Sequence, residues 1–271
     1  MTHWTTTVYR EHGHLMYDVE AAIFQNDILT DFEMSMLGKS AAQIGGAVGS
    51  PLLDLACGPG RHSRRFAQEG LAVTGIDLSE SFLGIGRAVS LDTAHGQRPH
   101  FACGDMRHLP IRDGCFRTVV LLGNSFGYFP EEQNLDVLCE AHRTLAPGGF
   151  FCMEITDRDA YLPNLRPFER ERIQSRAFGE LESSWTKSWD PATRRVHTWE
   201  RHCRLSTGEV LYEGAYDLRL YGRDEIGQLL RAADFRAVGF HQGSPRELAL
   251  AEGLGETLGA AGQVLFVGAL T

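Results

Sequence analysis

Short apolar runs alternate with polar stretches of helical spacing through the middle of the chain. The apolar runs occupy residues 51–56, 71–78, 99–104, 116–123 and 149–155. Helices are predicted between them, near residues 61–69, 80–91 and 131–145. Short buried strands separated by helices are typical of βαβ units, which build a parallel sheet that is covered on both faces. The third helix is expected to end before Pro147, because Pro147, Gly148 and Gly149 cannot continue it.

Two segments depart from this alternation. Residues 8–48 carry apolar side chains such as Ile28, Phe32 and Met36 at spacings of three and four, which predicts helices. Residues 160–220 are rich in Trp, Tyr and other strand-forming residues, with turn signals at 190–193 and 206–209, which predicts an antiparallel meander. The α/β pattern then resumes with a helix at 223–233 and strands at 235–241 and 263–270.

The elements together predict one α/β domain that carries an insertion. We assign residues 1–50 to an N-terminal helical segment, 51–159 and 222–271 to the α/β core, and 160–221 to a β-meander insertion. A chain of 271 residues with 43% hydrophobic residues can bury a large core without disulfides or a structural metal.

Charge and composition narrow the class of partner. The net charge of −9 argues against a broad nucleic-acid-binding surface, and Arg61, Arg64 and Arg65 are expected on the solvated face of their helix. No apolar run approaches the length of a membrane span, and the first residues lack the apolar core of a secretory signal. We therefore expect a cytoplasmic protein with six reduced cysteines, since no CxxC pair occurs.

The sharpest local signal is the sequence LLDLACGPG at residues 52–60, which follows the first apolar run. Glycines at a strand-to-helix turn let a ligand approach backbone N–H groups. Asp77 ends the second strand, where a carboxylate can accept hydrogen bonds from two ribose hydroxyls. A dinucleotide site favours GxGxxG, but Ser63 stands at the third glycine position, and Asp54 before the glycines favours a cationic cofactor without phosphate.

Four segments in order resemble the successive motifs of class I S-adenosylmethionine-dependent methyltransferases, in the small-molecule, natural-product branch. They are residues 54–60, 75–79 (GIDLS), 103–106 (CGDM) and 145–149 (LAPGG). The resemblance implies a Rossmann-like fold: a seven-stranded, mostly parallel sheet with the last strand antiparallel, helices on both faces and an added antiparallel β insertion. It also implies S-adenosyl-L-methionine as cofactor and S-adenosyl-L-homocysteine as product.

The resemblance also assigns cofactor contacts. It places Gly58 at the methionine part, Asp77 at the ribose hydroxyls, Leu78 and Met106 at the adenine ring, and Asp105 at the adenine amino group. The complete expected set is Asp54, Ala56, Cys57, Gly58, Gly60, Asp77, Leu78, Gly104, Asp105, Met106, Leu122 and Gly123. Alternatively, Asp105 is only a turn residue and Asp77 only an acid favoured by a helix dipole.

Three residues are candidates for the catalytic step. Tyr128 follows the fourth strand at a position that is often His in sugar N,N-dimethyltransferases, and its alternative role is packing under the insertion. Glu154 ends the fifth strand, beyond which ligands of open α/β sheets bind. Tyr17 resembles a residue of the family's lid helix, with Tyr9 and Trp4 as further lid candidates. No histidine set has metal-ligand spacing, so no metal is expected.

These observations predict methyl transfer by in-line displacement to a small molecule, an intermediate of bacterial secondary metabolism. The segment 1–50 would act as a lid, and 160–221 would cap the acceptor or make a homodimer contact. Neither a nucleic acid nor a membrane is expected as partner. An S-adenosylmethionine-binding protein that acts as a cyclase or another non-methylating enzyme is the main alternative, and an NAD-dependent oxidoreductase is a third. Whether carbon, nitrogen or oxygen is methylated stays open.

Overall fold

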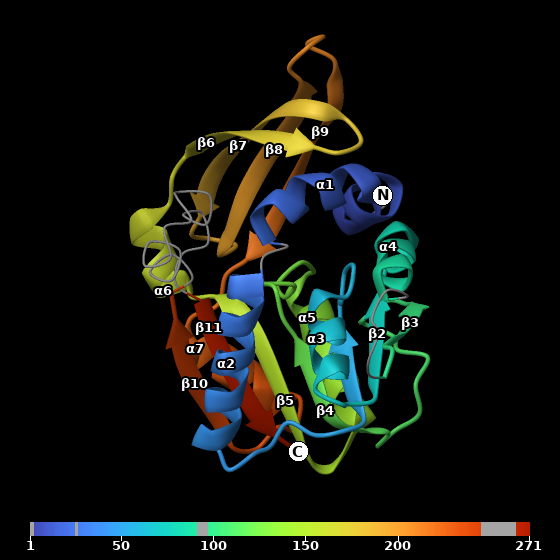
Figure 1. The fold of residues 1–271 in the computed structure, drawn as a ribbon. Coiled ribbons are helices and arrows are strands. Elements are labelled where there is room, and N and C mark those ends of the chain that lie inside the picture. The colour runs from blue at the N-terminus through green and yellow to red at the C-terminus, as the bar shows by residue number, and fades with distance from the viewer. Residues whose placement is uncertain (1–2, 25–26, 91–96, 245–263) are drawn as a thin grey trace.

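The structure of the chain is a computed structural model that describes residues 3–24, 27–90, 97–244 and 264–271 (Figure 1). Residues 245–263, which belong to the predicted core segment 222–271, lie outside the described residues. The main sheet has seven strands, in the order β3 (His100–Cys103), β2 (Val73–Asp77), β1 (Leu52–Leu55), β4 (Phe116–Leu121), β5 (Leu145–Thr156), β11 (Val264–Leu270) and β10 (Val238–Gly243). Among the described strands of this sheet, β11 alone runs opposite to the other six, which confirms the predicted seven-stranded, mostly parallel sheet.

Both faces of this sheet are covered by helices, as predicted. Successive strand residues point to opposite faces, so Leu52 packs into one apolar core and Leu53 into the other. Both residues are fully buried, because each face carries its own helical layer. The first layer contains α2 (Asp27–Gln43) and α3 (Arg61–Gln68), and the second contains α5 (Glu131–Thr144) and α7 (Arg223–Ala232).

Strand β5 begins earlier than the predicted run 149–155. The helix α5 ends at Thr144, and Leu145 is already extended, with φ −75° and ψ 137°. The pairing with β4 is irregular here, since Phe116 lies opposite Leu145 and Thr118 lies opposite Phe150. The residues after α5 therefore enter the sheet at once, through a bulged first part of the strand.

The predicted insertion forms a separate four-stranded antiparallel meander. Its strands, in both chain order and spatial order, are β6 (Phe168–Ser175), β7 (Gly179–Asp190), β8 (Arg195–Arg204) and β9 (Val210–Arg219). A short helix, α6 (Arg158–Tyr161), and a 3-10 turn (Leu162–Asn164) lead into it from β5. Figure 1 shows this sheet above the edge at which the parallel strands end.

The N-terminal helical segment is divided between two places. A π-helix (Thr6–Glu11) and α1 (Gly13–Phe24) lie between the antiparallel sheet and α4 (Glu80–Ser90) (Figure 1). Here Val8 and Leu15 share an apolar cluster with residues of α4 and of the insertion. The following helix α2 instead packs against β5, β10 and β11. The π-helix and α1 therefore lie over the carboxyl ends of the parallel strands, whereas α2 covers one face of the sheet.

Candidate functional site

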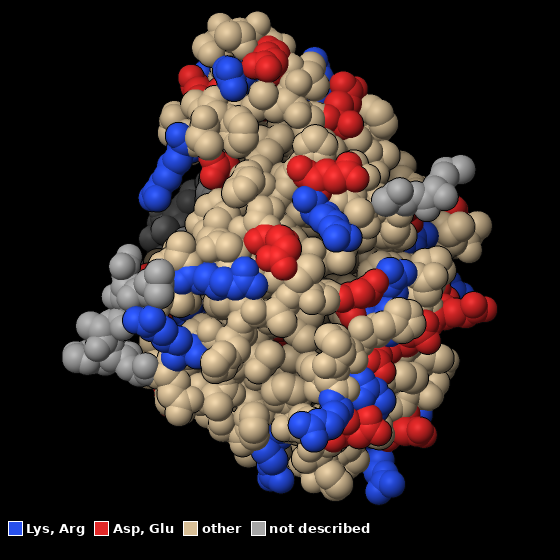
Figure 2. All heavy atoms as spheres, turned by 90° about the vertical axis from the view of Figure 1, so that its right-hand side faces the viewer, with Lys and Arg blue, Asp and Glu red and all other residues tan. Residues whose placement is uncertain are grey.

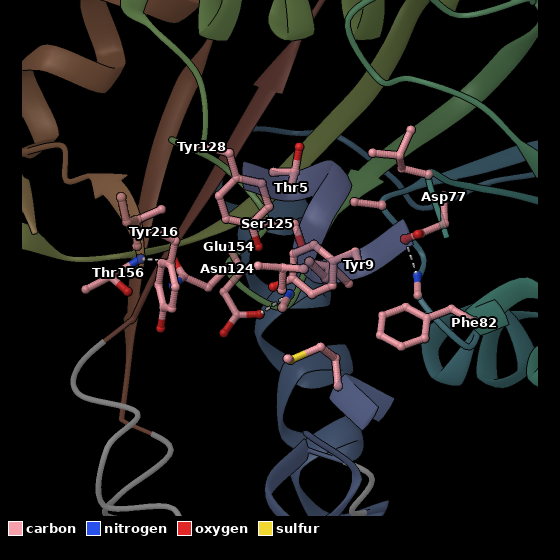
Figure 3. A pocket seen from close by; sticks show the side chains of 18 of the residues that line it. Thr5, Tyr9, Asp77, Phe82, Asn124, Ser125, Tyr128, Glu154, Thr156 and Tyr216 are labelled. Carbon is pink, nitrogen blue, oxygen red and sulfur yellow. Dashed lines mark hydrogen bonds between the residues drawn. The ribbon is translucent and has the colours of Figure 1, made fainter. Parts of the chain in front are cut away.

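A cavity of about 430 Å³ opens where the parallel strands end, and it extends up to the inner face of the antiparallel sheet. Its walls come from the turns after β1, β2, β3 and β4, from the N-terminal segment, and from β6 to β9. Figure 3 shows Asp77 on one side of this space, Glu154 and Tyr216 on the other, and Tyr9 and Tyr128 between them. The cavity thus joins the predicted cofactor residues to the insertion.

The turn after β1 is built to bring backbone close to Asp77. Gly58 has a φ of +55°, and its N–H donates to Asp77 Oδ2 at 2.8 Å. Asp77 Oδ1 accepts from the N–H of Ser79 at 2.8 Å. A Cβ on Gly58 would have Phe82 as its nearest neighbour, at 3.8 Å, so this glycine faces open space. Burial raises the pKa of Asp77 to about 6.

Ten of the twelve expected cofactor residues line the cavity: Ala56, Cys57, Gly58, Asp77, Leu78, Gly104, Asp105, Met106, Leu122 and Gly123. Among them Asp105 is paired with Arg107, whose Nη2 lies 2.6 Å from Asp105 Oδ2. Partial burial opposes ionisation of Asp105, but the hydrogen bonds from Arg107 outweigh it and lower the pKa of Asp105. The Arg107 guanidinium also stacks 4.3 Å from the centre of the Phe129 ring.

The other two expected cofactor residues lie behind the wall of the cavity. Asp54 is 1% exposed, and its Oδ2 accepts a hydrogen bond from Ser63 Oγ at 2.5 Å. Gly60 has a φ of +76°, and a Cβ there would lie 2.4 Å from the Phe101 ring. Asp54 and Gly60 thus shape the turn from the inside, and their expected contact with a cofactor stays a prediction.

Glu154 sits at the floor of the cavity beside a buried ion pair. It is 4% exposed, and its Oε2 accepts from the N–H of Gly123 at 2.9 Å. Burial, followed by the nearby Glu33 carboxylate, raises the pKa of Glu154 to about 8. Burial also opposes ionisation of Glu33, but His62 and Arg61 outweigh it and lower the pKa of Glu33 to about 2. The floor therefore combines a firmly charged carboxylate with one that readily holds a proton.

The ion pair on the floor was not predicted. Arg61 Nη2 donates to Glu33 Oε1 at 2.8 Å, and His62 Nε2 lies 2.6 Å from Glu33 Oε2. The Arg61 side chain is only 11% exposed, so its expected place on a solvated helix face is wrong, whereas Arg65 is 43% exposed. A sequence signal existed, because Glu33 lies four residues from both Leu29 and Leu37 on the buried stripe of its helix.

Tyr128 reaches the cavity from the loop after β4. It lies edge-on to Trp4, with ring centres 5.0 Å apart, and is stacked on Tyr9 at 6.4 Å. The lid candidates Trp4 and Tyr9 thus line the cavity together with Tyr128. Tyr17, the third catalytic candidate, does not line it, and packs edge-on against Phe82 at 6.4 Å.

The inner face of the antiparallel sheet forms the roof. Strand alternation and register bring together its lining residues Glu169, Glu171, Trp185, Lys187, Val196, Thr198, Glu200, Tyr216 and Leu218. Lys187 is paired with Glu169 inside the cavity wall. Trp199 faces the other way and is 49% exposed. Trp185 and Tyr216 belong to the Trp- and Tyr-rich segment noted in the sequence, whereas the charged roof residues were not predicted.

Metal-ligand clusters, membrane-spanning helices and broad positive areas are the remaining features that bear on function. Within the described ranges, no group of three or more His, Cys, Asp or Glu side chains could hold a metal ion. No helix in the described part of the chain is long and apolar enough to cross a membrane. On the face shown in Figure 2, Lys and Arg side chains lie beside Asp and Glu side chains instead of forming one positive area.

Comparison with known proteins connects this site to one family. The methyltransferase domain family matches residues 52–149. The chain is 37% identical to the ubiquinone/menaquinone biosynthesis C-methyltransferase UbiE of Dinoroseobacter shibae over 122 residues, which are 44% of each protein. Alignments to the curated relatives cover less than half of those proteins' length.

Two solved structures share the fold at low identity. An S-adenosylmethionine-dependent methyltransferase from Clostridium acetobutylicum superposes with a TM-score of 0.68 at 14% identity, covering 96% of this chain and 97% of that one. The S-adenosylmethionine-bound CalS10 of Micromonospora echinaspora, an amino pentose methyltransferase involved in calicheamicin biosynthesis, gives 0.59 at 18% identity, covering 88% and 91%. Coverage of 96% leaves too few residues unmatched to omit the insertion, so the shared fold includes the antiparallel sheet.

Proposed function

We propose that this protein transfers a methyl group from S-adenosylmethionine to a small-molecule acceptor, because residues 52–149 match the methyltransferase domain family and the chain shares the fold of an S-adenosylmethionine-dependent methyltransferase. The observation that carries the proposal is the single cavity. It runs from Gly58 and Asp77 at the strand ends to Thr198 and Tyr216 on the insertion. A cofactor at one end and an acceptor at the other would share one enclosed space.

The lining residues suit this cofactor. Each Asp77 oxygen accepts one backbone hydrogen bond and has a further lone pair for a ribose hydroxyl. Leu78 and Met106 offer apolar contact to an adenine ring. The cationic side chains among the described lining residues are already paired, Arg61 with Glu33, Arg107 with Asp105 and Lys187 with Glu169. A pyrophosphate would find no free cation among them, which favours a phosphate-free cofactor over NAD.

The residues around the cavity give the reaction its geometry. The bound cofactor would supply a methyl group on a sulfonium sulfur, which departs as a neutral thioether when the lone pair of the acceptor atom displaces it. Holding the acceptor atom in line is the main contribution of the protein. Trp4, Tyr9 and Tyr128 line this space as a group of aromatic rings, which would help to exclude water when the substrates are bound.

A proton leaves the acceptor atom when that atom starts as a hydroxyl or an ammonium group. Glu154, with its pKa raised to about 8, lies on the floor where it would accept this proton. Tyr128 would orient the acceptor through its hydroxyl group. These two are the proposed catalytic residues, and Tyr17 is left out of the proposal because it is not among the residues that line the cavity.

We also propose that the acceptor is an intermediate of secondary metabolism. The enclosed cavity fits a small molecule better than a polymer, and the fold is shared with CalS10, whose pathway makes calicheamicin. UbiE is named a C-methyltransferase, so the similarity of this chain to UbiE leaves methylation of a carbon atom as an alternative. The insertion, which supplies the roof, would select among acceptors.

Calorimetric titration with S-adenosylhomocysteine and, separately, with NAD tests the cofactor on the wild type and on Asp77→Ala. We expect S-adenosylhomocysteine alone to bind, with at least tenfold lower affinity in the variant. Transfer of labelled methyl from S-adenosylmethionine to a panel of natural-product intermediates then tests the reaction. Binding of NAD, or no binding of S-adenosylhomocysteine, would overturn the proposal. Binding without turnover of any acceptor would favour the non-methylating alternative.

A further inference from the structure

Glu200 is a buried carboxylate in the roof of the cavity, and one of its oxygens lacks a hydrogen-bond partner among the described residues. It lies on β8 of the roof, lines the cavity and is 5% exposed. Its Oε2 accepts a hydrogen bond from Trp185 Nε1 at 3.2 Å. Its Oε1 has no partner among the described residues. Buried polar atoms are nearly always hydrogen-bonded in folded proteins, so this oxygen calls for a partner from outside the chain.

The groups packed around Glu200 do not neutralise it. His202 Nε2 is 3.8 Å from Glu200 Oε2, beyond hydrogen-bond distance, and burial lowers the pKa of His202 to about 4, which keeps it neutral. Burial raises the pKa values of Tyr212 and Tyr216, so both stay protonated and carry no charge. Lys187 is held by Glu169. No cation of the surrounding roof is therefore available to this carboxylate.

Aromatic rings stand beside the same carboxylate. Trp185 lies directly across from Glu200 on β7, and on β9 the opposite residue is Gly214, where the Tyr212 ring fills the space that a side chain would take. Tyr216 lies opposite Thr198 on the same face and is 5.3 Å from the Trp4 ring. A carboxylate beside aromatic rings can bind an organic cation, through an ion pair and through cation–π contacts.

The charged residues that line the cavity also favour a cationic ligand. Glu171 and Glu200 line it as acidic residues, and neither has an Arg or Lys ion-pair partner in the described part of the chain. Burial raises the pKa of Glu200 to about 7, so Glu200 is mostly ionised at pH 7.5, whereas Glu154 still holds most of its proton there. The cationic lining residues are each neutralised by an acidic neighbour, as described above. A ligand that brings a positive charge therefore meets a favourable field, whereas an anionic acceptor would be repelled.

We propose that Glu200 binds a protonated amino group of the acceptor, with Trp185, Tyr216 and Trp4 as the aromatic wall, so that the acceptor is an amine-bearing small molecule. This inference rests on the proposed function, because it concerns the acceptor end of the same cavity. The contact fixes how the acceptor is recognised and does not assign the atom that is methylated. Glu200 is a specificity-determining residue in this scheme.

The test compares two probes of the same shape that differ in charge. Protein saturated with S-adenosylhomocysteine is titrated at pH 7.5 with cyclohexylamine, which is protonated there, and with cyclohexanol, and binding is followed by ligand-observed NMR. We expect the wild type to bind cyclohexylammonium at least tenfold more tightly than cyclohexanol. Glu200→Gln keeps an oxygen for the Trp185 N–H but loses the charge, so it should bind the ammonium about tenfold more weakly.

The matched control is Glu213→Gln, on the outer face of the neighbouring strand β9, where Glu213 is solvent-exposed and 3.6 Å from Arg201. It should bind both probes as the wild type does. Equal binding of the ammonium by wild type and Glu200→Gln, equal binding of the two probes, or no binding of the ammonium would each overturn the inference alone. Failure of the wild type to bind S-adenosylhomocysteine would overturn the proposed function and this inference with it.

Discussion

The guanidinium of Arg195 donates a hydrogen bond to the backbone carbonyl of Tyr128 at 3.1 Å. The same group reaches the carbonyls of Gly127 at 3.2 Å and Phe129 at 3.0 Å, and it is paired with Asp217. Arg195 begins β8 of the insertion, whereas Tyr128 follows β4 of the parallel sheet. One side chain thus joins the roof of the cavity to the loop that carries the candidate catalytic tyrosine.

Arg195→Lys should loosen this connection. A single ammonium cannot satisfy three carbonyls and Asp217 together, so we expect the free energy of unfolding to fall by about 1–3 kcal/mol. The Michaelis constant for the acceptor should rise several-fold, and the affinity for S-adenosylhomocysteine should stay within about twofold. Urea unfolding, calorimetry and acceptor kinetics measure the three quantities. Arg201→Lys, on the same strand but 45% exposed, should change none of them, and an equal loss in both variants would contradict the role of Arg195.

Asp77 predicts a pH dependence of cofactor affinity. Its pKa is raised to about 6 by burial, and protonation removes an acceptor site needed for ribose hydroxyls. The affinity of the wild type for S-adenosylhomocysteine should therefore be constant above pH 7 and fall as the pH drops through about 6. Asp77→Asn should bind at least tenfold more weakly at pH 7.5 and lose this dependence, in calorimetry between pH 5 and 8.

The control for this pH series is Glu80→Gln, at the exposed start of α4. It should bind S-adenosylhomocysteine with the affinity and the pH profile of the wild type. A wild-type profile that is flat between pH 5 and 8 would show that the charge on Asp77 is not needed.

The main sheet could be predicted because the sequence pattern that indicates each strand lies within a few neighbouring residues. Leu52 and Leu53 point to opposite faces and are both apolar, and that pattern already requires a strand covered on both sides. The glycine turn likewise depends on neighbouring residues, so Gly58 and Asp77 could be brought together by motif spacing alone.

The buried charges of the site could not be predicted in the same way. Arg61 opens a helix whose pattern is compatible with exposure, and only the packing of α2 against α3 brings Glu33 to it. In the insertion, alternation shows that Trp185 and Lys187 share a face but not which face turns inward. The place of Glu200 over the cavity depends on the docking of the whole meander, which is not encoded in any short segment.

Glu154→Gln should have opposite effects on stability and on activity. The folded protein holds the Glu154 proton up to about pH 8, whereas the unfolded chain releases it near the ordinary glutamate pKa of about 4.5, so wild-type stability falls as the pH rises between these values. The glutamine avoids this cost. Its melting temperature should exceed that of the wild type at pH 8 and match it at pH 4. Turnover should fall, and its rise with pH through about 8 should disappear.

Glu132→Gln, at the exposed first turn of α5, is the matched control for both readouts. It should follow the wild type in melting temperature and in the pH profile of turnover. If Glu154→Gln instead melted below the wild type at pH 8, the carboxyl would have to be ionised and partnered, and its proposed part in proton transfer would fall.

Tyr128→Phe and Tyr17→Phe separate the two tyrosine candidates. Tyr128 lines the cavity, so loss of its hydroxyl should lower turnover at least tenfold while S-adenosylhomocysteine still binds. Tyr17 packs against Phe82 outside the lining, so its variant should keep turnover within about twofold. Initial rates of labelled methyl transfer decide between them. A larger loss in Tyr17→Phe would restore Tyr17 as the catalytic candidate.

Arg61→Met tests whether the floor of the cavity depends on its ion pair. The substitution leaves Glu33 buried with only His62 beside it, and removal of one partner from a buried pair costs about 3–5 kcal/mol in the free energy of unfolding. Arg65→Met, on the same helix but in an exposed pair, should cost less than about 1 kcal/mol in urea unfolding. Combining Arg61→Met with Glu33→Leu should recover most of the loss, because no unpaired charge remains. A double variant less stable than Arg61→Met would show that Glu33 stabilises the fold through His62 instead.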